Sequence, residues 1–409
     1  SELNGLGVDS YTYNTIPNCF TYMDSQALAA SRITNLQNHP YLNLQGRNTA
    51  IAVIDSGIDY THPAFLSYER TRIAYLWDQR IPSDNSTVPY GSVYTEEQIN
   101  AALQSEDPWE IVPSRDENGH GTFMAGIAAG TPEPTEEFSG AAPEATLIIV
   151  KLKPAKNYLR EFYFLPEGVD YYQENDIMFG ISFALECARQ LQMPLVICIG
   201  LGNNQGTHQG KNPLALYMDS VTRNPQTAVT VAAGNEGNSR RHYMGEIRPQ
   251  ERNVTVEMRV GEEERGFFVE FWGSSLYLYR VRLQSPSGEI LDVSTIRGTG
   301  TQTLSFVFVE TKVEVGYSAI ELQSGSTLIF FRFISPVAGI WRFLVYSESL
   351  DTVEFHMWLP VHTTFRTETY FLEPSPYNTV TNPGDSEDSI TVTAYDNRDQ
   401  SLYLEASRG

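Results

Sequence analysis

The fold of this chain is decided by a stretch that reads Ile51-Ala52-Val53-Ile54-Asp55-Ser56-Gly57-Ile58-Asp59. The apolar run before Asp55 is typical of a buried parallel strand, and Ser56-Gly57 gives that strand a sharp exit. A carboxylate in this place is shielded from water, as one that orients a catalytic histidine has to be. Two other interpretations are open for Asp55 taken alone. It could be half of an aspartic-protease dyad, for which the chain has no second Asp-Ser/Thr-Gly, or a simple turn residue.

Short apolar runs alternate with helical patterns from about residue 47 to residue 240. Strands are predicted at 49–54, 145–152, 195–199 and 227–232, and helices at 120–129, 176–192 and 213–223. This alternation indicates an α/β fold, a parallel sheet flanked by helices, in which ligands bind beyond the carboxyl ends of the strands. Asp55, Gly200 to Gly202 and Gly234-Asn235 all follow strands, so we expect them to gather at one edge of the sheet.

The pattern changes near Arg248, where β-rich pieces separated by turns such as Pro286-Ser287-Gly288 begin. They continue to about residue 362 and include no convincing helix, which indicates a β-sandwich or jelly roll. A strand predicted at 389–394 then resumes the α/β pattern. The predicted organisation is one α/β domain, made of 1–245 and an incomplete continuation at 365–409, interrupted by an inserted all-β jelly-roll domain at 246–364.

His120 stands in a fixed frame, Asn118-Gly119-His120-Gly121-Thr122, ahead of a small, apolar helical run. Its glycines allow close backbone approach, and Thr122 can cap the helix. A helix of this kind can lie deep against the sheet and bring the imidazole to Asp55. A lone histidine is more often structural than catalytic, but no other histidine here has such a setting. No His-x-x-x-His or Cys-x-x-Cys pair supports a metal site instead.

Asn235 lies in a third motif, Ala232-Ala233-Gly234-Asn235-Glu236-Gly237. A carboxamide at the end of a rigid strand can stabilise an oxyanion, since such a site needs a preorganised neutral donor. Taken alone, an ordinary Asn-Glu-Gly turn is the simpler interpretation. The combination with Asp55 and His120 favours the catalytic one.

Together these motifs resemble those of the subtilisin-like serine proteases, in their order and in their separation. The resemblance covers roughly residues 45–240 and 365–409. It implies that Asp55 and His120 are triad members of a serine endopeptidase that cleaves peptide bonds, and that Asn235 belongs to the oxyanion hole. A rival hypothesis is a catalytically silent relative that serves as a binding or signalling protein.

The same resemblance implies where a peptide substrate would bind. Gly200, Leu201 and Gly202 look like the strand that pairs with the substrate backbone, with Gly200 in place of the commoner serine. Gly234 and Glu236 would border the pocket for the P1 side chain. A carboxylate at that rim would favour a basic or polar P1 residue.

Softer patterns resemble the Csp germination proteases of Clostridia and their relatives. They are the β-rich insertion, Met357-Trp358-Leu359-Pro360, Asn203 to His208, and Thr379 to Gly384 with Ile390 to Asp396. The chain departs from the family because it has no Gly-Thr-Ser to supply the nucleophile. We therefore expect the serine on a C-terminal segment beyond Gly409. We also expect a cleaved N-terminal prodomain, which a start at Ser1 without an initiator Met fits.

A net charge of −22 argues against nucleic acids and anionic membranes as partners, because phosphate binding needs clustered Lys and Arg. No apolar run approaches the length of a membrane span. The expected partners are a protein or peptide substrate, the prodomain and the serine-bearing segment. The chemistry requires no cofactor, and no pattern indicates a structural calcium ion, although the resemblance allows one. The resemblance implies a spore-associated or extracellular location.

Overall fold

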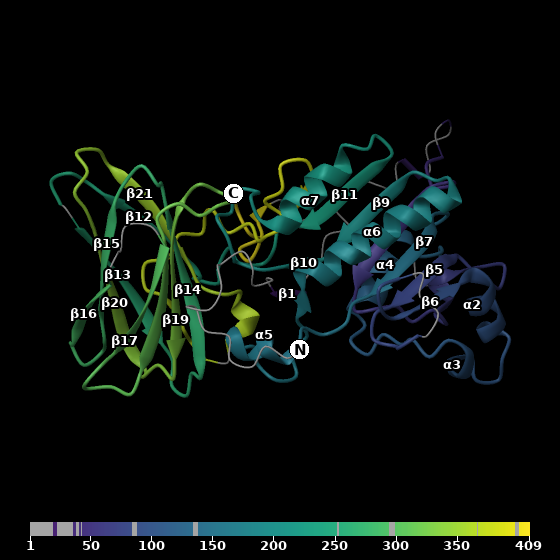
Figure 1. Cartoon of the computed structure of the whole chain (residues 1–409). Coiled ribbons are helices and arrows are strands. Elements are labelled where there is room, and N and C mark those ends of the chain that lie inside the picture. Colours follow the sequence, from purple (N-terminus) through teal and green to yellow (C-terminus); the bar gives the residue numbers. More distant parts are fainter. Residues whose placement is uncertain are drawn as a thin grey trace.

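The computed structural model describes residues 19–22, 36–37, 41, 43–83, 88–133, 138–251, 253–293, 299–365, 367–396 and 401–409. The start at Ser1 lies outside these residues. Figure 1 shows an α/β part and a β-sandwich side by side, with the C-terminal residues between them. The expected α/β fold with an inserted all-β domain is therefore confirmed.

A seven-stranded sheet forms the centre of the α/β part. In spatial order it consists of β23 (Ile390–Val392), β11 (Thr227–Ala232), β9 (Leu195–Ile199), β2 (Ala50–Asp55), β7 (Thr146–Lys151), β5 (Ile73–Asp78) and β6 (Ser92–Thr95). Neighbouring strands are parallel, except that β6 is antiparallel to β5. Each strand that the sequence predicts is present to within a few residues, whereas β5 and β6 are additions.

The two faces of β2 explain how helices cover the sheet. Side chains alternate along a strand, so Ala50, Ala52 and Ile54 pack on α6 (Glu174–Leu191) and α7 (Pro213–Thr222). Ile51 and Val53 face the opposite side, where α4 (His120–Ala129) lies with Ala125 and Ala129 buried against them. These are the three predicted helices. Three shorter helices are α2 (Glu96–Leu103), α3 (Pro108–Ile111) and α5 (Asn157–Phe162).

Several short elements lie around this core. They are β1 (Cys19–Tyr22), β8 (Tyr172–Gln173) and β10 (Leu201–Gly202), which form a three-stranded sheet, and the hairpins β3 (Leu66–Ser67) with β4 (Arg70–Thr71) and β24 (Tyr395–Asp396) with β25 (Ser401–Leu402). Two 3-10 turns, η2 (Pro63–Phe65) and η3 (His362–Thr364), complete the set. The three-stranded sheet and η3 prove important for the site.

The inserted part consists of two packed antiparallel sheets. One has the order β12 (His242–Ile247), β21 (Val353–Trp358), β14 (Gly266–Gly273), β19 (Thr327–Ile334), β18 (Lys312–Ser318) and β17 (Thr299–Ser305). The other has the order β16 (Ile290–Val293), β15 (Tyr279–Gln284), β20 (Gly339–Ser347), β13 (Asn253–Val260) and β22 (Tyr370–Phe371). Aromatic side chains fill the space between them, among them Phe271, Phe331 and Trp341. The strands span residues 242–371, a wider range than the predicted 246–364, and β22 at the far end is too short to leave a pattern.

The sandwich is seated firmly on the α/β part. Leu159 and Phe162 of α5 pack against Phe268 and Phe330 on the outer face of the six-stranded sheet. The rings of Phe162 and Phe330 stack with their centres 6.1 Å apart. Because this contact is apolar and buried, the two parts form one continuous structure rather than two domains on a loose linker.

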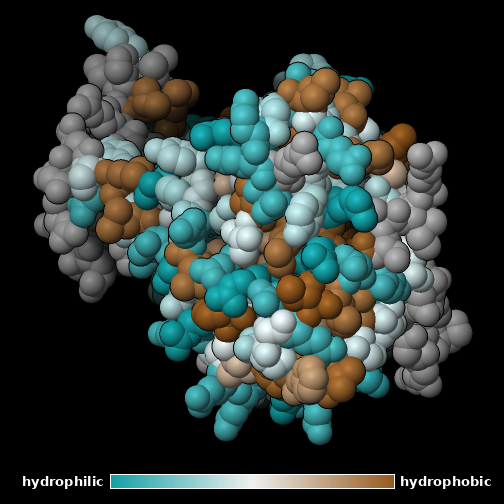
Figure 2. All heavy atoms as spheres, turned by 90° about the vertical axis from the view of Figure 1, so that its left-hand side faces the viewer, coloured by the Kyte–Doolittle hydropathy of each residue, from teal (hydrophilic) through white to brown (hydrophobic). Residues whose placement is uncertain are grey.

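Seen from the side of the sandwich, the surface mixes hydrophilic and hydrophobic patches (Figure 2). The most exposed leucines of this part are Leu276, Leu322 and Leu350, each more than four-fifths exposed. Their three loops lie at one end of the sandwich, because the strand register pairs Gly273 with Thr327 and with Phe355.

Candidate active site

Asp55 and His120 meet at the carboxyl end of β2. Asp55 is 1 % exposed, and His120 is the first residue of α4. The His120 Nδ1 atom lies 2.8 Å from Asp55 Oδ1 and 3.0 Å from Oδ2. A proton on Nδ1 is therefore held by the carboxylate, which leaves Nε2 to accept a proton. The sequence prediction that these two residues come together agrees with this geometry.

Asp116, which the sequence interpretation missed, fixes this pair. One carboxylate oxygen accepts hydrogen bonds from Ser56 Oγ (2.7 Å) and from the Gly119 amide (2.9 Å). The other accepts from the Thr122 amide (2.9 Å) and from Thr122 Oγ1 (2.6 Å). Burial raises the pKa of Asp116, but these bonds, those of Thr122 first, outweigh it and hold the pKa below its usual range. An acidic residue four positions before the histidine was the available signal.

Two glycines let the helix approach the turn that follows β2. A Cβ atom on Gly121 would lie 2.2 Å from the Gly57 carbonyl oxygen, and Gly119 adopts a left-handed φ of +87°. Ser56 Oγ accepts from the Gly121 amide at 2.9 Å, so the start of α4 is bonded directly to that turn. The close backbone approach expected from the flanking glycines is present.

Gly200 borders the Asp55–His120 pair at the end of β9. A Cβ atom there would lie 3.2 Å from His120 Cε1, 3.1 Å from Met124 Cε and 3.6 Å from Asp55 Oδ2. Any side chain at position 200 would therefore begin in contact with the imidazole of His120.

Leu201 and Gly202 form β10, whose backbone is paired with β1. Thr21 lies opposite Gly202 and Tyr22 opposite Leu201, in antiparallel register. On its other side β1 pairs with β8, so it is the middle strand of three. The edge predicted to receive a peptide backbone thus accepts an extended antiparallel strand, which in this structure comes from the chain itself.

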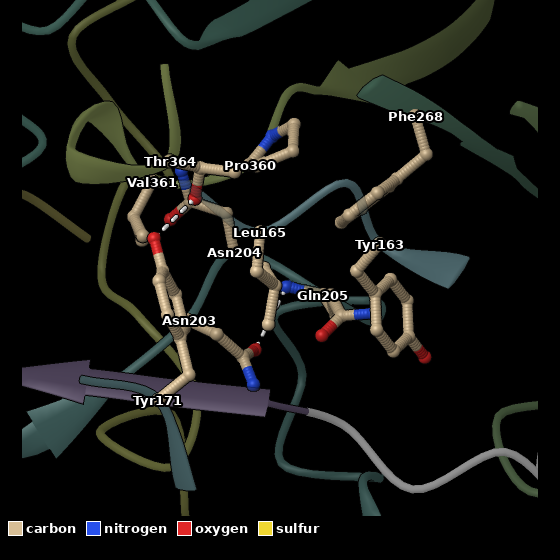
Figure 3. A pocket seen from close by; sticks show the side chains of 10 residues that line it. All are labelled: Tyr163, Leu165, Tyr171, Asn203, Asn204, Gln205, Phe268, Pro360, Val361 and Thr364. Carbon is tan, nitrogen blue, oxygen red and sulfur yellow. Dashed lines mark hydrogen bonds between the residues drawn. The ribbon is translucent and has the colours of Figure 1, made fainter. Parts of the chain in front are cut away.

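A pocket lies next to this edge, between the α/β part and the sandwich (Figure 3). Its polar lining comes from the turn after β10, where Asn203, Asn204 and Gln205 are all buried. Asn203 Oδ1 accepts from the Gln205 amide at 2.9 Å and shapes the turn. Tyr171 and Thr364 also line the pocket, and their hydroxyls lie 3.0 Å apart. The pocket therefore joins the predicted substrate edge to η3.

Gly234, Asn235 and Glu236 follow β11 at the same edge of the sheet. Gly234 has a φ of +100°, and Asn235 is half-buried. Ser407 holds this turn, because its amide donates to the Gly234 carbonyl and its Oγ accepts from the Glu236 amide, both at 2.9 Å. Asn235 thus stands on a turn fixed by residues that lie far along the chain.

Glu236 does not stand at the rim of an open pocket. It is 1 % exposed, and its Oε1 accepts from the His362 amide (3.1 Å) and lies 2.7 Å from His362 Nδ1. Burial raises the pKa of Glu236, but the contacts with His362 outweigh it and lower the pKa overall. The same contacts raise the pKa of His362. The structure thus differs from the sequence expectation because η3, 126 residues further on, brings His362 to this carboxylate.

Within the described ranges, no three His, Cys, Asp or Glu side chains gather as a metal site. The same ranges contain no helix that is both long enough and apolar enough to cross a membrane. The acid–base pair and the Asn235 turn both lie at the carboxyl edge of the sheet.

Comparisons with known proteins find relatives of this chain in sequence and in structure. The family model of the subtilases matches residues 46–258. The structure of the CspB protease of Clostridium perfringens superposes with a TM-score of 0.79 at 29 % identity, covering 94 % of this chain and 76 % of that one.

Two curated sequences are also similar. The major intracellular serine protease of Bacillus subtilis is 29 % identical over 134 residues, 33 % of each chain. Subtilisin-like protease 3 of Trichophyton equinum is 25 % identical over 287 residues, 70 % of this chain and 55 % of that protein. The chain thus spans a third and about half of the length of these relatives.

Proposed function

We propose that the complete protein is a serine endopeptidase, because this chain belongs to the subtilase family. His120 Nε2 would take the proton of a serine hydroxyl as its oxygen attacks the peptide carbonyl. Asp55 would orient the ring and stabilise the imidazolium, and His120 would then pass the proton to the leaving amine. Asn235 would donate a hydrogen bond to the oxyanion. The observation that carries this proposal is the 2.8 Å contact between His120 Nδ1 and the buried Asp55 carboxylate.

The nucleophilic serine would come from a segment beyond Gly409, since the chain contains no Gly-Thr-Ser. The edge strand β23 supports this assignment. It pairs with β11 on one side, yet Ile390 and Val392 are 56 % and 50 % exposed. Half-exposed aliphatic side chains on the outermost strand of a parallel sheet are what a covering segment would bury.

A substrate would bind as an extended peptide between β8 and β10. The support is β1, which already pairs with both strands. In this proposal Gly200, Leu201 and Gly202 contact the substrate backbone, and Gly234 borders the P1 pocket. A basic P1 preference set by Glu236 remains a prediction, and the burial of this carboxylate argues against it. It is tested by comparing Lys, Arg and Leu at P1 in wild type and Glu236→Gln.

The similarity to CspB supports a Csp-like processing protease, spore-associated or exported, as the finer assignment. Its partners would be a protein substrate, a cleaved N-terminal prodomain and the serine-bearing segment. No cofactor takes part in the proposed chemistry, and a structural calcium ion is not part of it.

The alternative is a silent relative that binds peptides without cleaving them. The observation in its favour is that β1 of the chain itself lies between β8 and β10, where a peptide would bind. The intact contact between Asp55 and His120 favours the enzyme.

The two functions are separated by labelling the full-length protein with a fluorophosphonate probe. We expect one labelled serine in a Gly-Thr-Ser sequence, with labelling at least about 100-fold slower in His120→Ala. Folded full-length protein that acquires no label would contradict the protease and leave the binding function.

A further inference from the structure

The turn that carries Asn235 is held from two sides by remote segments. On one side, the C-terminal residues hold it through Ser407 and through Glu405, whose carbonyl accepts from the Gly237 amide at 3.0 Å. On the other side, η3 of the inserted sandwich reaches the Glu236 side chain. Glu236 directly follows Asn235, so whatever fixes the Glu236 side chain also restrains the Asn235 backbone.

The sandwich contacts the Glu236 carboxylate through one of its two oxygens. Glu236 Oε1 accepts from both the backbone amide and the Nδ1 atom of His362. A buried carboxylate that receives charge-assisted bonds is held more firmly than a neutral acceptor. Arg241, 7 % exposed at the start of the sandwich, adds a positive charge near Glu236 and stacks on Phe365 at 4.2 Å. His362 and Arg241 lie at the two ends of the insertion.

We propose that Glu236 and His362 are positioning residues through which the inserted sandwich fixes the oxyanion donor Asn235, an inference that rests on the proposed protease function. The sandwich then acts on catalysis without contacting the substrate. Thr364 of η3 also lines the pocket together with Asn203 to Gln205, which follow β10 (Figure 3). One element of the insertion therefore reaches both the turn after β10 and, through His362, the Asn235 turn.

Two rival interpretations make different predictions. If Glu236 contacts the P1 side chain, its removal changes which P1 residue is preferred. If the Glu236–His362 pair only stabilises the fold, its removal lowers the melting temperature and leaves the turnover number kcat unchanged. A positioning role lowers kcat for all P1 residues alike and leaves KM nearly unchanged, because an oxyanion donor acts on the transition state.

The first experiment measures kcat and KM of the full-length protein on peptides with Lys, Arg and Leu at P1. We expect His362→Ala to lower kcat about 10- to 30-fold, less than the 10²–10³-fold expected for losing an oxyanion donor outright. His362→Asn keeps a donor in place of Nδ1 and should recover kcat to within about threefold. Glu257→Gln, which removes a carboxylate from an ion pair within the sandwich, is the matched control and should not change kcat.

A double-mutant cycle with Asn235→Ala tests whether the effect passes through Asn235. If it does, His362→Ala should lower kcat no further once Asn235 is absent, since coupled residues are not additive. Full additivity of the two losses would overturn the proposal. Should His362→Ala fail to fold, His362→Gln takes its place in the cycle.

Hydrogen exchange provides a readout that needs no activity. In the 409-residue chain, His362→Ala should speed the exchange of the amides of residues 234–239 at least about tenfold and leave α4 unchanged. Unchanged exchange in this turn would overturn the positioning role even if the protein were a silent relative. A failure of the fluorophosphonate test alone would overturn only the proposed protease function.

Discussion

The two halves of the candidate site are built in different ways. The acid–base half joins Asp55 to His120 through residues 55–59 and 116–122, which lie close together at the end of one buried strand. Its polar groups are bonded among themselves through Asp116 and Ser56. The oxyanion half, around Asn235, depends on Ser407 and His362, which lie 171 and 126 residues from Glu236.

This difference implies that the halves respond differently to change. The first should stay intact as long as the sheet and α4 are folded. The second depends on how the sandwich and the C-terminal residues are seated. Perturbations of the insertion should therefore affect oxyanion stabilisation before they affect the acid–base pair.

The strongest test of the first half is Asp55→Asn. Loss of the carboxylate leaves the imidazole in the wrong tautomer, so we expect kcat to fall by about 10⁴-fold. Steady-state hydrolysis of a peptide by the full-length protein measures this, with circular dichroism to confirm that the fold is kept. A loss of less than tenfold would show that Asp55 does not hold the catalytic histidine.

Asp116→Ala should affect the same half less severely. It leaves the donors of Ser56, Gly119 and Thr122 without their acceptor, which costs about 2–3 kcal/mol of unfolding free energy. The displaced start of α4 should lower kcat about 10- to 100-fold. Urea unfolding and kcat are measured together, and Asp116→Asn, which keeps one carbonyl acceptor, should be milder in both. Equal effects of the two variants would argue against the hydrogen-bond network.

Acid should weaken the seating of the sandwich on the α/β part, because histidines with lowered pKa values are buried there. His208 of the α/β part stacks on Trp358 of the sandwich with ring centres 4.3 Å apart, and His242 stacks on the same ring at 4.7 Å. The His242 Nε2 atom lies 3.0 Å from His356 Nδ1. Burial, together with His356 and His208, lowers the pKa of His242 to about 3. In the unfolded chain it titrates near pH 6.5, so the unfolded state binds a proton that the folded state refuses.

The contribution of neutral His242 to the unfolding free energy is therefore fully present above about pH 6.5 and is lost as the pH falls towards 3. We expect the unfolding free energy to drop by about 2–3 kcal/mol between about pH 7 and about pH 4.5 from His242 alone. Urea titrations at both pH values measure this. The drop should become smaller in His242→Asn, and an equal drop in that variant would assign the acid sensitivity to other groups.

Gly200→Ala should have the smallest effect. The new methyl group would press on His120 Cε1 and Met124 Cε, and the flexible Met124 side chain can give way. We expect kcat to fall about threefold with KM unchanged. A loss of more than 30-fold would mean that the space beside the imidazole is needed for the substrate itself.

The first half of the site was predictable because its signals are local. Four apolar residues before Asp55 gave β2, and the glycines around His120 gave the close approach of α4. The same local patterns gave β9, β11 and α7. Even Asp116 left a signal, since an acidic residue four positions before the histidine can bond the start of the helix.

The second half was less predictable, because contacts between remote segments leave no periodic pattern. The partner of Glu236 is set by how η3 follows β21. Nothing near Glu236 in the sequence indicates that His362 is this partner. The antiparallel edge pair β5–β6 was overlooked although Ile73 to Asp78 reads as a strand. The pairing of β1 with β10 joins two short segments that lie far apart in the sequence, and each is too short to leave a clear strand pattern.

The middle strand of the small sheet has one more consequence. A peptide that binds between β8 and β10 must displace β1, which is tethered to the same molecule. Because β1 belongs to the same molecule, it competes at an effective concentration that does not depend on the concentration of the protein. Weak peptides would therefore be rejected by simple competition. The chain's own residues 19–22 would set a threshold affinity that any substrate has to exceed.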